Sequence, residues 1–342
     1  MKKGAFLTAI VFILFAVFLY GRADTSKYAS NDGEEKNESE KSEKNEEDYI
    51  RWVDFSVSSE AISDAIRIDI ETKDNDMHIT VPEALAYLST KNYGVYDKYK
   101  SSYLDKLRED PALLKDAEGK KLYNYYLKAY SAALGSLVGD FSMVTTDENG
   151  EQTEEALYGV RLFSPIASGF YYTDYDDFGA ARSYGYRRRH LGHDMLGSVG
   201  TPIIAVESGV VEACGWNQYG GWRIGIRSFD GQRYYYYAHL RKNHPFNDIY
   251  EGKIVNAGEV IGYLGMTGYS ARENTNNIDT PHLHIGLELI FDKSQKDGYN
   301  QIWIDLFELT KLLSKYKSKV YFNEENKEYY SKIVYIYNET PD

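Results

Sequence analysis

The sequence predicts an α+β protein: a mainly antiparallel β-sheet or sandwich, preceded by a small helical domain and an N-terminal transmembrane helix. Three observations carry this prediction. From about residue 160 onward, short β-branched or aromatic runs alternate with glycine turns, and no long helical pattern separates them. Residues 49–156 carry helical apolar patterns instead. The chain opens with a long apolar run.

The apolar run covers residues 4–21 and follows two lysines. Its 18 residues would span about 27 Å as a helix, which is enough for a bilayer core. The preceding lysines predict a cytoplasmic N-terminus and a body outside the cytoplasm. We therefore favour a membrane anchor at residues 1–23 of a single-pass bacterial membrane protein. The alternative is a cleaved signal peptide, for which residues 21–23 offer small side chains, and hence a secreted protein.

Residues 24–48 predict a disordered acidic linker. They contain one aromatic residue, no Ile, Leu, Val or Phe, and a formal charge of −6. Such a segment cannot bury enough apolar surface to offset the entropy of ordering. The whole chain carries a net charge of −13 and has no basic patch, which argues against nucleic-acid binding because that needs clustered cations.

Residues 49–156 predict the helical domain. Helical patterns begin near Pro82 and run through residues 96–107 and 121–137. Residues 144–156 are acidic and rich in turn formers, so we interpret them as a hinge. The lone His78 is expected on a strand or at the surface. No catalytic site is evident here, and we expect that a protein partner would bind this domain.

Residues 157–292 predict the sheet domain. Its expected strands lie at 202–206, 210–214, 223–227, 234–238, 259–264 and 283–289. The single cysteine, Cys214, excludes a disulfide within the chain and is expected in the core. Residues 293–342 predict a C-terminal extension with a helix at about 302–314 and a short strand at 332–337.

Six of the seven histidines lie between residues 190 and 284, in or near three local patterns. His190 and Asp194 form a His-x-x-x-Asp pattern, His239 ends a strand, and His282 and His284 form a His-x-His pattern at the start of another. Alternate side chains of a strand share a face, so the histidines of the His-x-His pair point the same way. Each pattern alone is weak, but together they predict a metal site.

Other residues of this region leave two readings open. His193 could contact a metal, although an exposed position is favoured, and His244 is expected at the surface. The arginines at 187–189 could receive a stem-peptide carboxylate or form a solvated approach to the site. The tyrosines at 171–175, 184 and 186 could line a groove or pack on the sheet.

These patterns, with GTPIIAVESGVV at 200–211 and VNAGEVIGYLGMTGYS at 255–270, resemble the lysostaphin/LytM-type zinc endopeptidases, which are peptidoglycan hydrolases. The resemblance covers about residues 160–290. It implies that His190, Asp194 and His284 bind one Zn²⁺ and that His239 and His282 are the catalytic histidines. Three such ligands leave a fourth position for water, which zinc activates. Which histidine acts as the base stays open.

The resemblance implies a zinc-dependent endopeptidase that hydrolyses peptide cross-links of bacterial peptidoglycan, in stem peptides or cross-bridges. The alternative is a non-catalytic wall-binding or membrane-scaffold protein with the same fold, for example in a sporulation or division complex. Because all five site positions are intact, we favour the enzyme. Residues 271–280 form a longer loop than the family usually has, and we expect this loop to border the cleft and to influence substrate preference.

Overall fold

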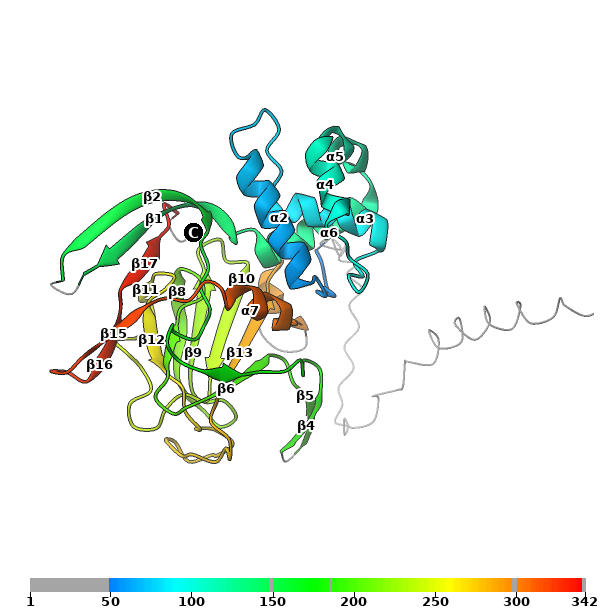
Figure 1. Ribbon diagram of the computed structural model, residues 1–342. Helices are drawn as coiled ribbons and strands as arrows, with labels where there is room; N and C mark the ends of the chain where they lie inside the picture. Colours follow the sequence, from blue (N-terminus) through cyan, green and yellow to red (C-terminus); the bar gives the residue numbers. More distant parts are fainter. Residues whose placement is uncertain (1–48, 148–149, 185, 297–299, 340–342) are drawn as a thin grey trace, which may run out of the picture. The chain divides into compact units, whose positions relative to one another are not determined.

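The computed structural model describes residues 49–147, 150–184, 186–296 and 300–339 (Figure 1). The predicted anchor at 4–21 and the linker at 24–48 lie outside these residues. Within the described ranges, no helix has the length and apolar character needed to cross a membrane. Residues Asp48–Asp342 form one compact unit. The boundaries drawn above between helical domain, sheet domain and extension stay predictions.

The first part of this unit is helical, as predicted. Its helices are α2 (Ser59–Thr72), α3 (Val81–Asn92), α4 (Ser102–Glu109), α5 (Ala112–Ala117) and α6 (Lys121–Leu134). Helix α3 begins as its sequence predicts, because Thr80 and Glu83 form a capping box and Pro82 lies in the first turn. Helix α4 begins later than predicted, since Tyr96 is buried with its hydroxyl on Ser89 instead of starting a helix.

The predicted hinge at 144–156 is wrong. Strands β1 (Val138–Thr146) and β2 (Gln152–Val160) form a long antiparallel hairpin across it. Strand β17 (Ile333–Ile336), which confirms the short strand predicted near the C-terminus, pairs with the other side of β1. The acidic side chains that suggested a hinge are exposed on β2, an edge strand of this three-stranded sheet, where charge is tolerated and discourages edge pairing.

An eight-stranded sheet forms the body of the molecule, and its recorded strand pairings are antiparallel, as predicted. The order is β11-β8-β9-β10-β13-β6-β3, with β14 also paired to β13. The strands are β3 (Tyr172–Thr173), β6 (His193–Gly197), β8 (Gly209–Asn217), β9 (Gly221–Ser228), β10 (Arg233–Ala238), β11 (Ile254–Val255), β13 (His282–Leu289) and β14 (Ile302–Ile304).

Three two-stranded sheets surround this body. They are β7 (Pro202–Ile204) with β12 (Val260–Tyr263), β4 (Ala181–Tyr184) with β5 (Tyr186–Arg189), and β15 (Val320–Asn323) with β16 (Glu328–Ser331). The helix predicted at 302–314 is shorter than expected: α7 covers Phe307–Leu313, and a short 3₁₀ turn lies at Lys293–Gln295. The residues before α7 form β14 because Ile302 and Ile304 find paired positions on β13.

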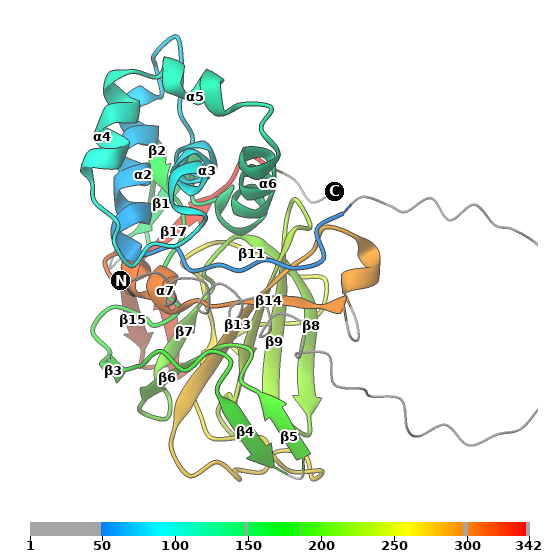
Figure 2. The same cartoon turned by 90° about the vertical axis from the view of Figure 1, so that its right-hand side faces the viewer.

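Helices α2–α6 gather at one end of the large sheet, and the β4–β5 hairpin lies at the other (Figures 1 and 2). Apolar side chains of the helices and of one sheet face belong to a single buried core. Arg233 of β10 also links the two parts: it is paired with the buried Glu207 carboxylate of the sheet region and donates a hydrogen bond to the Ala132 carbonyl near the end of α6. The end of the sheet away from the helices is left for a site.

Candidate metal centre and active site

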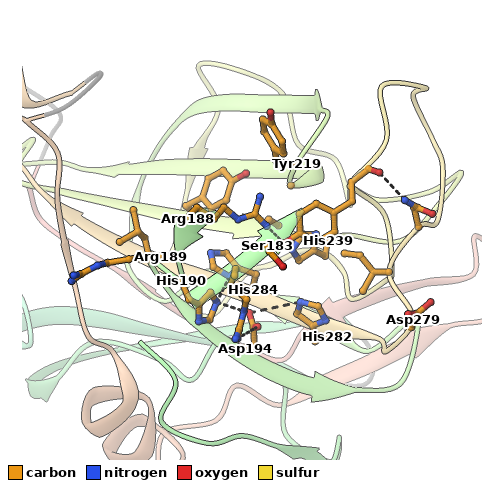
Figure 3. Close-up of a pocket in the computed structure, with 18 residues that line it drawn as sticks. Ser183, Arg188, Arg189, His190, Asp194, Tyr219, His239, Asp279, His282 and His284 are labelled. Carbon is orange, nitrogen blue, oxygen red and sulfur yellow. Dashed lines mark hydrogen bonds and ion pairs between the residues drawn. The ribbon is translucent and has the colours of Figure 1, made fainter. Parts of the chain in front are cut away.

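Three of the predicted site residues meet where strands β6 and β13 pair. Asp194 of β6 lies directly opposite His284 of β13, and His190 follows β5. The Asp194 Oδ1 atom lies 3.0 Å from His190 Nε2 and 2.9 Å from His284 Nδ1 (Figure 3). The two histidine nitrogens are 3.0 Å apart. One oxygen and two nitrogens therefore form a nearly equilateral triangle.

This triangle fits a zinc ion. Ligand atoms at about 2.0–2.1 Å from a tetrahedral centre lie about 3.3 Å from one another, close to the separations found here. Burial opposes ionisation of Asp194, but hydrogen bonds from His190 and His284 outweigh it and hold the Asp194 pKa well below its usual range. Burial also lowers the pKa of His284. Both groups thus favour the deprotonated form that a metal ligand requires.

Two residues that the sequence patterns did not indicate contact the predicted ligands. The Asp177 side chain is buried, and its Oδ1 atom lies 3.1 Å from Nδ1 of His190. The same nitrogen lies 3.3 Å from the backbone carbonyl oxygen of Asp177, and a carbonyl acceptor there favours the tautomer that leaves Nε2 for a metal. Arg182 contacts the other Asp177 oxygen and approaches Asp194 Oδ2 at 3.5 Å. Neither residue belongs to a spaced motif, so no local sequence signal marked them.

Gly192, inside the HLGHD pattern, is required by the packing of His284. A Cβ atom at this position would lie 2.5 Å from Cε1 and 2.6 Å from Nε2 of His284, and 2.7 Å from the carbonyl oxygen of Ile285. Such distances are well inside van der Waals contact. The glycine therefore allows the imidazole of His284 to approach the main chain at residue 192 closely.

The predicted catalytic histidines lie beside this triangle. His239 follows β10 with a positive φ of 63°, a conformation that is uncommon for a residue with a Cβ and that clusters at functional sites. Its Nδ1 atom lies 2.9 Å from the Thr267 carbonyl oxygen, and Nδ1 of His282 lies 2.9 Å from that of Thr280. Burial, reinforced by the neighbouring His282, holds the His239 pKa well below its usual value.

All five predicted residues line one cavity of about 700 Å³. The same cavity is lined by Arg182, Arg188, Arg189, Tyr219, Tyr236, Tyr269, Asn277, Ile278 and Asp279, among others. The last three belong to the long loop at 271–280, so the loop borders the site. Asn274 anchors it by accepting hydrogen bonds from the Trp222 indole and the Asn243 backbone.

The exposed position expected for His193 is wrong. His193 is only 2% exposed, with Nε2 2.9 Å from Asp174 Oδ2 and its ring against Phe307 of α7. It precedes Asp194 in β6, and adjacent side chains of a strand point to opposite faces. Because the Asp194 side chain forms one corner of the triangle, the His193 side chain points away from the triangle and toward α7.

The remaining histidines and the cysteine lie outside the cavity. His244 is exposed and pairs with Glu328, in agreement with its predicted surface position. His78 is partly buried, and its Nε2 atom lies 2.8 Å from Asp69 Oδ1. Cys214 packs at the margin of the core and is only partly buried, and burial raises the pKa of its thiol.

The arginines at 187–189 do not all share one environment, and neither do the tyrosines. Arg188 and Arg189 line the cavity, whereas the neighbouring Arg187 is exposed and does not. Tyr171 and Tyr175 are exposed and lie outside the cavity lining, and Tyr172 packs against the core. The side chains at 184 and 186 lie outside the described residues.

A triangle of two imidazoles and one carboxylate, with further histidines beside it, is typical of zinc-dependent hydrolases. Residues 188–297 match the model of peptidase family M23, so the chain contains an M23 peptidase domain. This match confirms the resemblance drawn from the sequence patterns, and it includes His190, Asp194, His239, His282 and His284.

Known proteins resemble parts of this chain. The L-Ala–D-Glu endopeptidase of Bacillus subtilis is 42% identical over 123 residues, 36% of either chain. Lysostaphin of Staphylococcus simulans is 38% identical over 96 residues, 28% of this chain and 17% of the relative. The chain thus spans about a third or less of the length of these relatives. The crystal structure of a LytM protein from Ruminococcus gnavus shares the fold over 78% of this chain and 91% of its own, at 21% identity and a TM-score of 0.51.

Proposed function

We propose that the chain is a zinc-dependent endopeptidase that hydrolyses peptide bonds in the cross-links of bacterial peptidoglycan. The observation that carries the proposal is the triangle of ligand atoms, about 3 Å on each side, which shares one cavity with His239 and His282. The M23 domain and its similarity to an L-Ala–D-Glu endopeptidase and to lysostaphin support the same reading. With all five positions present, a purely non-catalytic scaffold is the weaker alternative.

His190, Asp194 and His284 would hold the zinc ion, which when bound supplies a Lewis acid that activates water and polarises the scissile carbonyl. His239 and His282 would move the protons. The buried His239 stays neutral and offers Nε2 as the base. His282 faces the same space, and with Nδ1 held by the Thr280 carbonyl it would donate from a protonated Nε2 to the leaving amine.

The substrate lies outside the cytoplasm, so the proposal includes export. Residues 4–21 would direct the chain across the membrane and then either remain as an anchor or be cleaved. In the anchored form, the acidic segment at 24–48 would let the peptidase domain reach outward toward the wall. A protein partner would bind helices α2–α6, which lie at the end of the sheet away from the site.

The test measures zinc content and wall digestion with the purified full chain. We expect about one zinc per chain and release of wall peptides, with loss of both in Asp194→Ala and His284→Ala. His244→Ala is the matched control, because this histidine is exposed and lies outside the cavity. Mass spectrometry of the fragments identifies the bond that is cut. Digestion that is unaffected by the two ligand substitutions would overturn the proposal.

A further inference from the structure

Two arginines face each other in the hairpin that walls one side of the cavity. In the β4–β5 register, Arg182 lies directly opposite Arg188, and both side chains line the cavity. Like charges at directly opposed positions of an antiparallel pair destabilise it. In such a hairpin the two positive charges must be neutralised by other groups, or one of them stays available to bind an anion.

The two guanidinium groups differ in how they are compensated. Arg182 forms an ion pair with Asp177 and approaches Asp194. Among the residues that the structure describes, Arg188 has no carboxylate within ion-pair distance. Its guanidinium lies over the ring of Tyr269, with the carbon 4.6 Å from the ring centre, and 5.7 Å from that of Tyr219.

This aromatic setting holds the Arg188 side chain without neutralising it. The guanidinium donates a hydrogen bond to the hydroxyl of Tyr269, and the two rings restrict its position through cation–π contact. In Figure 3 the Arg188 side chain lies between Tyr219 and the site histidines. The result is a half-buried, pre-positioned cation beside the catalytic groups.

A guanidinium has five donors in a planar fork that matches the two oxygens of a carboxylate. Arg188 uses one of them on Tyr269. Arg189, the next residue of β5, is exposed, and its side chain extends away from the site histidines in Figure 3. The wall formed by β5 is thus chemically suited to an anionic group on the bound peptide, and a neutral glycine bridge has no such group.

We propose that Arg188 determines specificity by binding a free carboxylate of the substrate peptide near the scissile bond. This inference rests on the proposed function and names its substrate class: stem peptides whose acidic or diamino residue keeps an ionised carboxylate. Peptides in which that carboxylate is amidated, and neutral glycine bridges, would be poorer substrates because the positive wall then has no counter-charge.

The test compares kcat/KM for two stem peptides that differ only in a free or amidated carboxylate. With the zinc-loaded full chain, we expect the free carboxylate to be preferred by about 10- to 100-fold, the range of a charge-assisted hydrogen bond. Arg188→Gln should bring this preference close to one. Arg188→Lys should keep part of it, because lysine keeps the charge but lacks the fork. Arg187→Gln removes the same charge outside the cavity lining and should keep the full preference.

Binding of both peptides to the His239→Ala variant, measured by calorimetry, separates this inference from the proposed function. Carboxylate preference in binding without turnover by the unmodified chain would overturn the proposed function and support the role of Arg188. Turnover of both peptides at equal rates by the unmodified chain would overturn the inference and leave the proposed function intact. An equal loss of kcat/KM on both peptides in Arg188→Gln would also overturn the inference, since it would show a structural effect of the substitution.

Discussion

The rings of His239 and His282 meet edge to face with their centres 4.8 Å apart, and each is held at Nδ1 by a backbone carbonyl. A carbonyl oxygen can only accept a hydrogen bond, so in each neutral ring the proton must sit on Nδ1. The unprotonated Nε2 atoms are then left for the cavity. The main chain at Thr267 and Thr280, not an acidic side chain, therefore sets both tautomers for proton transfer.

Because neither ring belongs to the ligand triangle, His239→Ala and His282→Ala should separate chemistry from metal binding. We expect each to lower turnover of wall peptides by about 10²- to 10⁴-fold, the usual contribution of a positioned acid or base. Zinc content should stay at about one per chain. Metal analysis and peptide turnover on the same preparations check this, and loss of zinc from either variant would contradict it.

The pH profile should report the burial of His239. Burial lowers its pKa well below the ordinary value of 6.5, so the neutral base persists on the acid side of that value. As pH falls through the lowered pKa, the ring gains a proton and can no longer act as a base. We expect the acid limb of kcat/KM below pH 6.5. The profile is measured with zinc content verified at every pH, and an acid limb at or above the ordinary value would refute this role.

Gly192→Ala should disturb the metal centre without touching a ligand. The added Cβ would overlap the imidazole of His284, so the ring must shift from its present position beside Asp194 and His190. We expect zinc affinity to fall by about tenfold or more, on the scale seen when ligand orientation is lost. Competition with a chromogenic chelator measures this loss.

The matched control is Gly159→Ala in β2, where a Cβ would meet no atom within 4 Å. This variant should bind zinc like the unmodified chain. Equal zinc affinity in the two glycine variants would show that the close approach of Gly192 to His284 does not matter for the site.

The sequence predicted those features whose cause is local. The shared face of His282 and His284 follows from strand alternation, and the start of α3 follows from Pro82 and its capping residues. The five site residues could be grouped because each lies in a short motif, and the structure brings them into one cavity. Their roles as ligands and catalysts await the experiments above.

Features that depend on distant pairing could not be predicted. Residues 144–156 carry the composition of a hinge, yet β1 is stabilised there by β17, which lies about 190 residues further along the chain. Asp177 reaches His190 only once the β4–β5 hairpin has folded between them. The exposed position predicted for His193 is wrong because α7 covers this side chain, and no local sequence pattern connects α7 with β6.

Asp177→Asn should weaken zinc binding without removing a ligand. The Asp177 carboxylate lies 3.1 Å from Nδ1 of His190, and its negative charge increases the electron density at Nε2, the proposed ligand atom. A neutral amide does this less well, and we expect zinc affinity to fall by about 10- to 100-fold. Asp176→Asn, an exposed neighbour, is the control. If both variants release zinc to a chelator equally readily, Asp177 has no special role at His190.

The buried ion pair between Arg233 and Glu207 should contribute strongly to the stability of the fold. Both side chains are almost fully buried, 2.9 Å apart at the closest atoms. Arg233→Met leaves the Glu207 charge unpaired and the Ala132 carbonyl without its donor, so we expect a loss of about 3–5 kcal/mol in the free energy of unfolding. Adding Glu207→Gln should restore part of that loss, because the unpaired charge is then gone. Urea unfolding measures each step.

The matched control is Arg227→Met, whose Glu212 partner remains hydrated. It should lower the free energy of unfolding far less, and an equal loss would mean that burial of the pair contributes nothing special.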